Sequence, residues 1–472
     1  MSETISVAIL AAGLGTRMRS KKAKVMHEAG GKALVAHVVE AALRLARPEQ
    51  VAVVVGHQAE RVKELLAGYG VRFALQAEQK GTGHALLCCR ETLEGAGGLV
   101  IVSVGDCPLL RAETLEALVA RHRAQGAACT VITTELEDPT GYGRILKNAA
   151  GDVVGIVEQK AATAEQLRVR EINSGIYCFE GALLWPGLAR LEPNPASGEI
   201  YLTDLVEQLV AGGHRVTSYL IEDASELLGI NTRVELALVD RMLRERTVKA
   251  HMLAGVTIEK PETVSIDAGV VIGQDTVVEA FAQLRGRCVI GEECRIGSAS
   301  ILTNAVVEDG AVVEPFSVMA DSRLGAGARL GPFGRLRMEA QVGPGAVVGN
   351  FVELKKTRLG AGSKAQHLAY LGDAVIGENV NIGAGTITCN YDGMKKHQTK
   401  IGAGAFVGSN STLVAPVEVG EGSYIAAGSV ITEAVAEDTL ALGRARQVAK
   451  AGWPSKRRAA KCEDGKPGGG GQ

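Results

Sequence analysis

The second half of the chain repeats an aliphatic residue at every sixth position over long stretches. The longest run places a Val or Leu at nine successive sites from Val306 to Leu354. Neither a helix of period 3.6 nor a strand of period 2 generates a strict period of six. A hexapeptide repeat is the signature of a parallel β-helix, in which each short strand sends one aliphatic side chain into a narrow interior. The repeat positions are Ile266, Ile272, Val278, Leu284, Ile290, Ile296, Leu302, Val306, Val312, Val318, Leu324, Leu330, Leu336, Val342, Val348, Leu354, Ile401, Val407, Leu413, Val419, Ile425 and Ile431.

Glycine often follows the repeat residue, as in Ile272-Gly273 and Val407-Gly408, and lets the chain turn a corner. Three corners make a triangular coil, and this repeat type winds left-handed, an exception to the usual right-handed crossover. The period breaks between Leu354 and Ile376 and again between Ile387 and Ile401. Because solenoids place insertions on one face, often the binding face, we expect inserted loops at 355–375 and 388–400.

The first part of the chain has a different pattern. The apolar runs Val7–Leu10, Val51–Val55 and Leu99–Val104 are typical of buried parallel strands. Helical patterns such as Leu34–Ala46 and Thr114–Arg123 lie between the runs. This alternation predicts an open α/β parallel sheet of the Rossmann-like kind, which binds ligands at the carboxyl ends of its strands.

A long helix is expected to join the two parts. Thr232-Arg233-Val234-Glu235 has the capping-box pattern, and apolar residues follow at helical spacing to about Met252. The predicted organisation is therefore a first domain at 1–233, a linker helix at 234–254 and a β-helix domain at 255–472. A Gly-rich end to the sequence predicts a disordered tail from about residue 456.

Composition narrows the possible partners. A net charge of −2 favours neither nucleic acid nor an anionic membrane as partner. The sequence has no apolar segment near the roughly 20 residues of a transmembrane helix, and no secretory signal. Nine scattered cysteines without a CxxC pair indicate reduced thiols. We therefore expect a cytoplasmic protein.

A glycine-rich turn follows the first predicted strand. The segment Leu10-Ala11-Ala12-Gly13-Leu14-Gly15-Thr16-Arg17-Met18, with Lys24 after it, can present backbone N–H groups to phosphate oxygens. The dinucleotide fingerprint fails because Met18 stands where a third glycine is needed, and the Gly-Lys-Ser/Thr of the P-loop is absent. Two readings of the turn itself remain open, a nucleotide site and a plain strand–helix turn with solvated Arg and Lys.

The same segment resembles the signature of sugar-1-phosphate nucleotidyltransferases. Gln76–Ala85 resembles the uridine-reading loop of their UTP-specific branch. Further matches to the family's metal and sugar motifs occur in order at Val104-Gly105-Asp106, Gly141-Tyr142-Gly143-Arg144, Glu158, Glu171-Ile172-Asn173-Ser174-Gly175 and Gly229-Ile230-Asn231. With the hexapeptide repeats, the chain is similar from Val7 to about Gln447 to bifunctional N-acetylglucosamine-1-phosphate uridyltransferase/glucosamine-1-phosphate acetyltransferases.

The resemblance implies a uridylyl-transfer site in the first domain. Arg17 and Lys24 would neutralise the triphosphate, and Asp106 and Asn231 would bind Mg²⁺. Val104 stands where relatives often have Tyr. The residues implied to bind UTP and UDP-N-acetylglucosamine are Leu10, Ala11, Ala12, Gly13, Lys24, Gln76, Gly81, Thr82, Val104, Gly105, Asp106, Gly141, Glu158, Asn173 and Asn231.

The resemblance also implies an acetyl-transfer site in the β-helix. His367 would be the general base that takes a proton from the amine attacking acetyl-CoA, with Asn390 and Tyr391 near the reacting centre. Arg337, Lys355, Tyr370 and Asn381 would bind the amino-sugar phosphate. The residues implied to line the coenzyme path are Ala384, Asn390, Tyr391, Ser409, Ala427 and Arg444. Gly443 stands where relatives often have Ser.

Together these implications predict a homotrimer that acetylates glucosamine-1-phosphate with acetyl-CoA and then uridylylates N-acetylglucosamine-1-phosphate with UTP. The product would feed peptidoglycan and lipopolysaccharide synthesis. One alternative is a single-activity sugar-1-phosphate nucleotidyltransferase with an oligomerising β-helix. Another is a non-catalytic exchange-factor subunit of similar two-domain arrangement. The polar residues at positions 17, 24, 106 and 231 count against the second alternative, and the constellation around His367 counts against the first.

Overall fold

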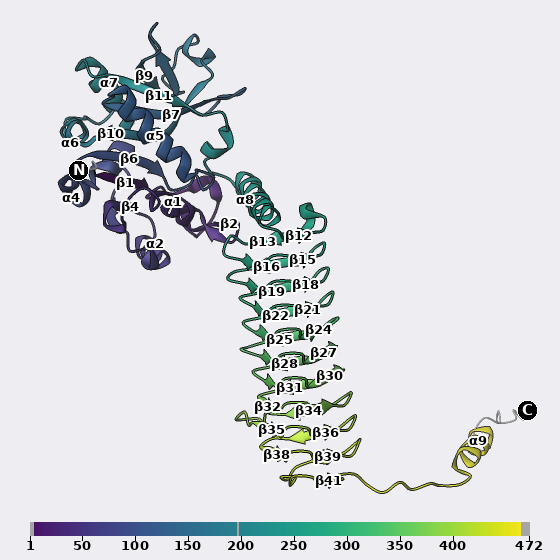
Figure 1. Ribbon diagram of the computed structural model, residues 1–472. Helices are drawn as coiled ribbons and strands as arrows, with labels where there is room; N and C mark the ends of the chain where they lie inside the picture. The colour runs from purple at the N-terminus through teal and green to yellow at the C-terminus, as the bar shows by residue number, and fades with distance from the viewer. Residues whose placement is uncertain (1–3, 196–197, 464–472) are drawn as a thin grey trace, which may run out of the picture. The chain divides into compact units, whose positions relative to one another are not determined.

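The computed structural model describes residues 4–195 and 198–463, and the chain divides into two compact units (Figure 1). The first unit runs up to Ala254 and takes in Lys260–Val270 and Leu284–Arg287. The second unit comprises Gly255–Glu259, Val271–Gln283 and the chain from Cys288 onward. Among the described residues, no helix is long and apolar enough to cross a membrane.

A nine-stranded mixed sheet forms the centre of the first unit. Its strands are β1 Ile5–Leu10, β4 Val51–Val55, β5 Arg72–Leu75, β6 Leu99–Val104, β7 Cys129–Glu135, β8 Arg144–Lys147, β9 Val153–Val157, β10 Glu171–Glu180 and β11 Val216–Leu220. The main path has the order β11-β7-β10-β6-β1-β4-β5, and a separate two-stranded hairpin is formed by β2 Glu28–Ala29 and β3 Lys32–Ala33. Because β1 pairs in parallel with both β4 and β6, three neighbouring strands end at one edge. Strand β10 departs from the parallel arrangement and runs antiparallel to β6 and β7.

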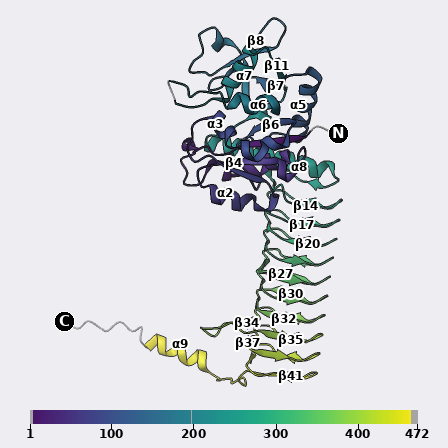
Figure 2. The same cartoon turned by 90° about the vertical axis from the view of Figure 1, so that its left-hand side faces the viewer.

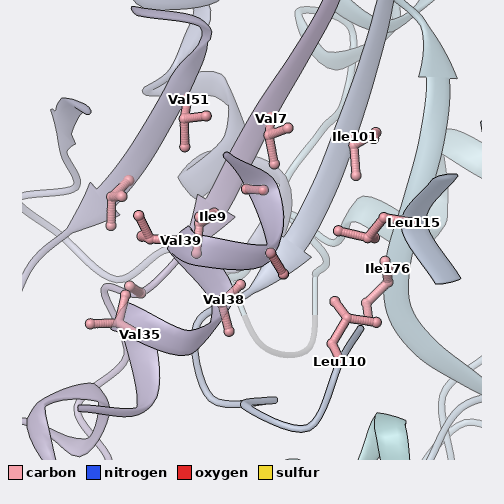
Figure 3. Packing of buried hydrophobic residues seen from close by; sticks show 14 of the residues in the cluster. Val7, Ile9, Val35, Val38, Val39, Val51, Ile101, Leu110, Leu115 and Ile176 are labelled. Atoms are coloured by element: carbon pink, nitrogen blue, oxygen red, sulfur yellow. The ribbon is translucent and has the colours of Figure 1, made fainter. Parts of the chain in front are cut away.

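Helices cover both faces of this sheet. Along β1, Val7 and Ile9 pack with the core that includes α1, α2 and α5, whereas Ala8 packs with the core on the other face. Figure 3 shows the first of these cores, with Val7 and Ile9 next to Val38 and Val39. The helices are α1 Leu34–Ala42, α2 Ala59–Leu66, α3 Thr82–Leu87, α4 Arg90–Leu93, α5 Ala112–Gln125, α6 Gly181–Leu188, α7 Leu202–Ala211 and α8 Arg233–Leu253. Short 3₁₀ turns lie at Thr16–Met18, Lys24–Met26, Pro48–Gln50, Ala67–Tyr69, Glu94–Ala96, Gln166–Arg168, Ala224–Leu227 and Pro261–Thr263.

Two helix ends differ from the sequence prediction. Helix α1 stops at Ala42 instead of Ala46, because Arg44 and Leu45 bond to carbonyls three residues back and tighten the chain into a turn. Helix α5 is longer than predicted at both ends. Helix α8 begins as expected, with the reciprocal bonds of the capping box between Thr232 and Glu235.

The hexapeptide region forms three parallel sheets that stack along a left-handed parallel β-helix, as Figures 1 and 2 show. The first sheet contains β12 Thr257–Ile258, β15 Val277–Val278, β18 Arg295–Ile296, β21 Val312–Val313, β24 Arg329–Leu330, β27 Val347–Asn350, β30 Lys364–His367, β33 Asn381–Ile382, β36 Phe406–Val407, β39 Tyr424–Ile425 and β41 Leu440–Ala441. The second contains β13 Ser265–Ile266, β16 Gln283–Arg285, β19 Ile301–Thr303, β22 Val318–Ala320, β25 Arg335–Arg337, β28 Glu353–Lys355, β31 Tyr370–Gly372, β34 Ile387–Cys389, β37 Thr412–Val414 and β40 Val430–Ile431. The third contains β14 Val271–Ile272, β17 Val289–Ile290, β20 Val306–Val307, β23 Arg323–Leu324, β26 Gln341–Val342, β29 Arg358–Leu359, β32 Ala374–Ile376, β35 Thr399–Ile401 and β38 Val417–Val419.

The predicted interior positions are wrong over one stretch. Val318 is 37% exposed, and the residues that point inward from β20, β21 and β22 are Val307, Val313 and Met319. The reason is that some sides of a coil are one residue shorter, so Val307 follows the inward Leu302 after five residues instead of six. The shift by one residue was not visible in the sequence because Val306-Val307 and Val312-Val313 are pairs of identical residues. A second short side before Leu324 restores the predicted register.

One of the two predicted inserted loops is absent. Between Leu354 and Ile376 the chain continues as regular strands β29 to β32, and the break in the period comes from two short sides. The second loop is real, because residues 390–398 lie between β34 and β35. Asp392 organises this loop by accepting the backbone N–H of Lys395 (2.6 Å) and Met394 (2.8 Å), and by contacting His397 Nε2 at 2.7 Å. These bonds, first that of Lys395, lower the pKa of Asp392.

Part of the predicted disordered tail is helical. Helix α9 spans Trp453–Glu463, and residues 464–472 lie outside the described part of the chain. Its sequence WPSKRRAAKCE is rich in Ala, Lys and Arg, which have high intrinsic helix propensity, and Pro454 stands in its first turn.

Candidate functional site

The glycine-rich turn leaves β1 between two neighbouring strands. The N–H of Ala11 donates to Val54 of β4 (3.0 Å), and the N–H of Gly105 donates to Leu10 (2.9 Å). The turn after β1 and the turn after β6 are thereby joined at the carboxyl edge of the sheet. This edge is where open α/β sheets bind their ligands.

Gly15 allows the turn to close on Lys24. Its φ of +61° lies in the left-handed region, and a Cβ at this position would lie 2.6 Å from Cβ of Lys24. Any other residue would meet both a strained backbone and a steric clash. The glycine therefore brings Lys24 against the start of the loop.

A cavity of about 560 Å³ opens at this edge of the sheet. It is lined by predicted residues from the loops after β1, β5 and β6, namely Leu10, Ala11, Ala12, Gly13, Arg17, Lys24, Gln76, Gly81, Thr82, Val104 and Asp106. From the predicted uridine-reading loop the lining also includes Gln79 and Ala85, and the structure adds three residues that sequence reasoning missed, namely Val25, Glu199 and Tyr201. Glu199 and Tyr201 precede α7, far from any recognised motif, and only the fold brings them here.

Four predicted polar residues meet at one wall of the cavity. The Nζ atom of Lys24 lies 2.5 Å from Oδ2 of Asp106 and 3.2 Å from Oδ1 of Asn231. The guanidinium of Arg17 donates to the same Asn231 oxygen at 2.9 Å. The four side chains come from three distant segments, so this convergence is a product of the fold.

The capping box of α8 positions Asn231. The Glu235 carboxylate accepts the backbone N–H groups of Asn231 (2.6 Å) and Thr232 (2.7 Å). The N–H of Ile230 donates to the backbone carbonyl of Asp106 at 3.1 Å. A motif that the sequence suggested only as a helix start thus also places a site residue next to Asp106.

The two oxygens of Asp106 and Asn231 fit a cation. They converge on a single ammonium group, and a carboxylate with an amide oxygen is a donor set that Mg²⁺ accepts. Within the described ranges no group of three or more His, Cys, Asp or Glu could hold a metal.

Gln76 lines the cavity and is buried, at 3% exposure. Its Nε2 donates to the carbonyl of Gly81 (3.1 Å) and lies 3.1 Å from Nδ1 of His84. Both contacts use the amide nitrogen, which orients the amide group. Gly81 itself needs a φ of +94° and packs against Ile200, where a Cβ would lie 2.5 Å from the carbonyl oxygen.

Besides Gly105 and Asn231, three predicted residues lie outside the cavity lining. Gly141 donates its N–H to Gln159, and Oδ1 of Asn173 accepts from the Tyr177 hydroxyl at 3.0 Å. The N–H of Asn173 donates to the carbonyl of Gly143 at 3.0 Å, which ties β10 to the loop before β8. Partial desolvation, and then Asp204, raise the pKa of Glu158.

Val104 differs from the residue that relatives often carry. It is half-buried, lines the cavity, and lies 3.6 Å from the place that a Cβ of Gly175 would occupy. Its contribution to the cavity is therefore apolar packing and backbone.

In the second unit, His367 lies at the end of β30 with its ring exposed. Its Nδ1 is 2.8 Å from Oδ1 of Asn350, a residue that sequence reasoning missed. Asn350 stands directly opposite His367 in the pairing of β27 with β30. The sequence signal was available, because Asn350 lies 17 residues earlier, which is one coil.

A cluster of basic residues lies on the second sheet. Lys355 is 3% exposed, and its Nζ contacts Oδ2 of Asp373 at 2.7 Å. The Asn390 amide donates to the same Asp373 oxygen at 2.5 Å. Burial opposes the charge on Lys355, but the bonds to Asp373 and Lys396 outweigh it and raise its pKa. Lys396 was missed as a member of this cluster, and its contact with Lys355 lowers its pKa.

Arg337 belongs to the same cluster by register. It stands opposite Lys355 in the pairing of β25 with β28, and its Nε donates to Glu353 at 2.6 Å. Tyr370 lies opposite Glu353 in the next coil. Tyr391, in contrast, bonds within its own loop, where its hydroxyl donates to Gly393 at 2.6 Å.

The residues predicted along the coenzyme path stack on successive coils. Asn410 donates its N–H to Ala384 (2.7 Å), and Gly428 donates to Ser409 (2.8 Å). Arg444 donates from Nη1 to the carbonyl of Ala427 at 2.8 Å. Ala384, Ser409 and Ala427 thus occupy equivalent corners, with Arg444 beside the last.

Close packing of the backbone explains Gly443. A Cβ at this position would lie 2.2 Å from the carbonyl oxygen of Val430. The carbonyl of Gly443 in turn accepts the N–H of Val430 at 3.0 Å. In this chain the position therefore accommodates no side chain without a backbone shift.

Comparisons with known proteins agree with both units. Residues 7–173 match the family model described as the MobA-like NTP transferase domain, and residues 269–304 and 398–433 match the bacterial transferase hexapeptide model of six repeats. The chain is 54% identical over 458 residues to the bifunctional protein GlmU of Solibacter usitatus (strain Ellin6076), covering 97% of this chain and 98% of that protein. It is 50% identical to the bifunctional protein GlmU of Koribacter versatilis (strain Ellin345), covering 96% of this chain and 97% of the relative. The corresponding protein of Pelobacter propionicus (strain DSM 2379 / NBRC 103807 / OttBd1) is 48% identical, with coverage of 96% and 98%.

These matches span both units, which separates this chain from a nucleotidyltransferase with a purely oligomerising β-helix. The chain therefore belongs to the GlmU family of bifunctional enzymes, which combine a uridyltransferase with an acetyltransferase.

Proposed function

We propose that uridylyl transfer takes place in the cavity of the first unit, within residues 1–233 and the start of α8. UTP is one substrate and N-acetylglucosamine-1-phosphate the other, and the products are pyrophosphate and UDP-N-acetylglucosamine. The observation that carries this proposal is the convergence of Lys24, Asp106, Asn231 and Arg17 at one wall. Phosphoryl transfer of this kind depends on positioning and charge neutralisation, and needs no nucleophilic side chain.

The four residues divide into two tasks. Arg17 and Lys24 neutralise the triphosphate and the pyrophosphate that leaves. Asp106 and Asn231 hold Mg²⁺, which supplies further charge neutralisation at the phosphates. Lys24 contacts both of these oxygens, so its ammonium group lies next to the atoms that would hold the metal.

Gln76 is the residue that selects uracil. Its amide nitrogen is held by Gly81 and His84, which aims its carbonyl oxygen away from these partners. A carbonyl accepts from the N3–H of uracil, whereas N3 of cytosine carries no hydrogen. A buried group built for one hydrogen bond discriminates against a base that cannot form it.

Acetyl transfer from acetyl-CoA to glucosamine-1-phosphate is assigned to the β-helix, residues 255–472. His367 takes the proton from the attacking amine. Arg337, Lys355 and Lys396 bind the sugar phosphate, with Tyr370 on the same sheet. Asn381, on β33 of the first sheet, is the remaining proposed ligand. The coenzyme extends along the corners that carry Ala384, Ser409, Ala427 and Arg444, with Asn390 and Tyr391 on the inserted loop at its reactive end.

The β-helix is proposed to assemble as a homotrimer, with acetyl-transfer sites shared between chains. Phe316, Phe333 and Phe351 form an exposed stack on successive corners, with ring centroids 5.2 Å apart in each pair. On the inserted loop, Tyr391 is 60% and Met394 is 88% exposed. Exposed apolar groups of this kind mark protein–protein contacts. Sedimentation of the full-length protein as three chains is the expected result, and a monomer with full acetyl-transfer activity would contradict the trimer.

The proposed location is the cytoplasm, where the product supplies peptidoglycan and lipopolysaccharide synthesis. The cysteines in the described part of the chain are free thiols, which suits a reducing compartment. No nucleic acid or membrane partner is proposed.

One assay tests both activities together. Purified protein is incubated with glucosamine-1-phosphate, acetyl-CoA, UTP and Mg²⁺, and the products are identified by mass spectrometry. UDP-N-acetylglucosamine is expected, with free coenzyme A and pyrophosphate. Omission of acetyl-CoA should stop product formation, and its replacement by added N-acetylglucosamine-1-phosphate should restore it.

A further inference from the structure

The imidazole of His367 is held by the coil beneath it. Its Nδ1 lies 2.8 Å from Oδ1 of Asn350. The backbone carbonyl of Asn350 accepts the N–H of Leu368, the residue after the histidine, at 3.1 Å. Both the side chain and the main chain of Asn350 are therefore bonded to the corner that carries His367.

The backbone around this contact is closely packed. Gly349 precedes Asn350, and a Cβ at Gly349 would lie only 2.0 Å from the carbonyl oxygen of Gln366. On the far side, the N–H of Gly385 donates to the carbonyl of His367 at 3.4 Å. The ring is thus attached to a segment with little freedom to shift, so the direction of its free edge depends on the bond to Asn350.

An amide carbonyl oxygen only accepts hydrogen bonds, so the Nδ1 that faces it carries the proton. In a neutral imidazole the lone pair then belongs to Nε2, the nitrogen on the exposed edge. We propose that Asn350 is a positioning residue for acetyl transfer, which fixes the histidine in the tautomer with a proton on Nδ1 and aims Nε2 at the substrate amine. This inference rests on the proposed role of His367 as general base.

The neutrality of the partner matters as much as its position. A carboxylate at position 350 would hold the ring by the same geometry but would stabilise the imidazolium and raise its pKa. A raised pKa keeps a base protonated at neutral pH and therefore inactive. Strands β27 and β33, which pair with β30, carry no ionisable residue, and Lys364 is the other ionisable residue of β30. An amide at position 350 is therefore a partner that orients the ring without adding a charge next to it.

Two substitutions separate orientation from charge. Asn350→Ala removes the acceptor, and we expect kcat for acetyl transfer to fall about 10- to 100-fold while KM for both substrates changes less than about twofold. Asn350→Asp preserves the shape and the acceptor, and we expect the acid limb of the pH profile of kcat/KM to move up by about one pH unit. Nitrogen-15 NMR of the His367 ring should show the neutral wild-type proton on Nδ1 and a shift of the population toward Nε2–H in Asn350→Ala.

Asn304 offers a matched control. Its Nδ2 donates to Asp321 Oδ1 at 3.1 Å, across the same spacing of one coil, but on strands remote from His367. Asn304→Ala should leave kcat, the pH profile and the ring tautomer at their wild-type values. Circular dichroism and thermal unfolding of all three variants should match the wild-type protein, which verifies that the β-helix itself is folded.

The outcomes distinguish the two levels of the hypothesis. If His367→Ala is inactive but both Asn350 variants keep the wild-type kcat, pH profile and tautomer, the positioning role is overturned and the base assignment stands. If His367→Ala retains acetyl transfer, the proposed function of His367 itself fails. If Asn350→Ala does not fold, the isosteric Asn350→Asp variant decides the question through its pH profile.

Discussion

The two candidate sites are built by opposite means. In the first unit, segments far apart in sequence meet at the edge of a sheet and enclose a cavity, with Lys24, Asp106 and Asn231 in mutual contact. In the second unit, site residues repeat along the outside of a coil, and His367 is exposed. One site is thus complete within its own unit, whereas the other is open on one side. From this difference we expect uridylyl transfer to need one chain and acetyl transfer to need the proposed assembly.

The largest effects are expected when one residue is removed from each site, which tests whether the two sites work independently. His367→Ala should lower acetyl transfer by about 10²- to 10⁴-fold, the range that a general base contributes, and spare uridylyl transfer. Lys24→Ala should do the reverse, with a loss of about 10²-fold or more, because a preorganised charge is missing at the phosphates. Initial rates of both reactions on each variant give the answer. Gln366→Ala, beside His367 on β30, and Lys22→Ala, near Lys24, are the matched controls.

A truncation tests whether the first unit is complete. Leu243 of α8 packs against Gly30, and Arg246 donates to the carbonyl of Leu109 at 2.8 Å. A chain ending at Arg287 keeps these contacts and should be monomeric and active in uridylyl transfer. A chain ending at Arg241 loses the buried Val248 and the partly buried Met242 and Leu243, or about 4 kcal/mol. Its Tm should be roughly 10 °C lower by scanning calorimetry. Equal Tm values for the two truncations would show that the second half of α8 is dispensable.

The buried pair in the second unit gives a stability prediction with a defined pH dependence. Hydrogen bonds from Lys355 and Asn390 outweigh burial and lower the pKa of Asp373, so its charge stabilises the fold above the ordinary carboxyl pKa and this stabilisation is lost as pH falls through the lowered value. Asp373→Asn leaves Lys355 buried without its counter-ion and should cost about 3 kcal/mol at pH 7.

The cost of Asp373→Asn should shrink as pH falls below about 4, because the wild-type protein then loses the same charge. Denaturant unfolding at pH 7 and at lower pH measures the effect. Asp321→Asn, on an exposed corner three coils away from Asp373, serves as the control. A cost that stays constant down to the lowest pH would mean that the ion pair is not its source.

The smallest effect concerns the choice of base. Gln76→Ala should reduce the preference for UTP over CTP by at least about 10-fold, the value of one lost buried hydrogen bond. Gln79 lines the same cavity but does not form the bonds that Gln76 makes with Gly81 and His84. For Gln79→Ala we therefore expect a change in KM without a change in the preference for UTP over CTP. Competition between the two nucleotides, read as the ratio of kcat/KM values, decides between the variants.

The sequence predicted the architecture well because the repeat of the second unit is periodic and the apolar runs of the first unit are contiguous. A six-residue repeat and three apolar runs specify a β-helix and a parallel sheet without knowledge of contacts. The errors arose where a local pattern was ambiguous, as with Val306 and Val307, either of which can face inward. Leu354 to Ile376 was misread for a similar reason, because two shortened sides look like an insertion when only the period is followed.

Site residues were predicted where they belong to a motif and missed where only the fold brings them in. Glu199 and Tyr201 line the cavity from a segment that has no motif of its own. Asn350 and Lys396 reach the second site through coil stacking and through the return of the inserted loop. Such residues depend on long-range register, which the local sequence does not contain.

The shortened sides of the coil limit which insertions and deletions such a chain can accept during evolution. Removing a single residue from a strand exchanges its inward and outward side chains, as the slip between Val306 and Val307 illustrates. A change at a corner, such as the inserted loop at 390–398, leaves every strand facing as before. Insertions and deletions are therefore tolerated in two forms: the gain or loss of a whole coil, and a change in the length of a corner loop. A site that spans neighbouring coils, such as Asn350 and His367, is inherited only as an adjacent pair.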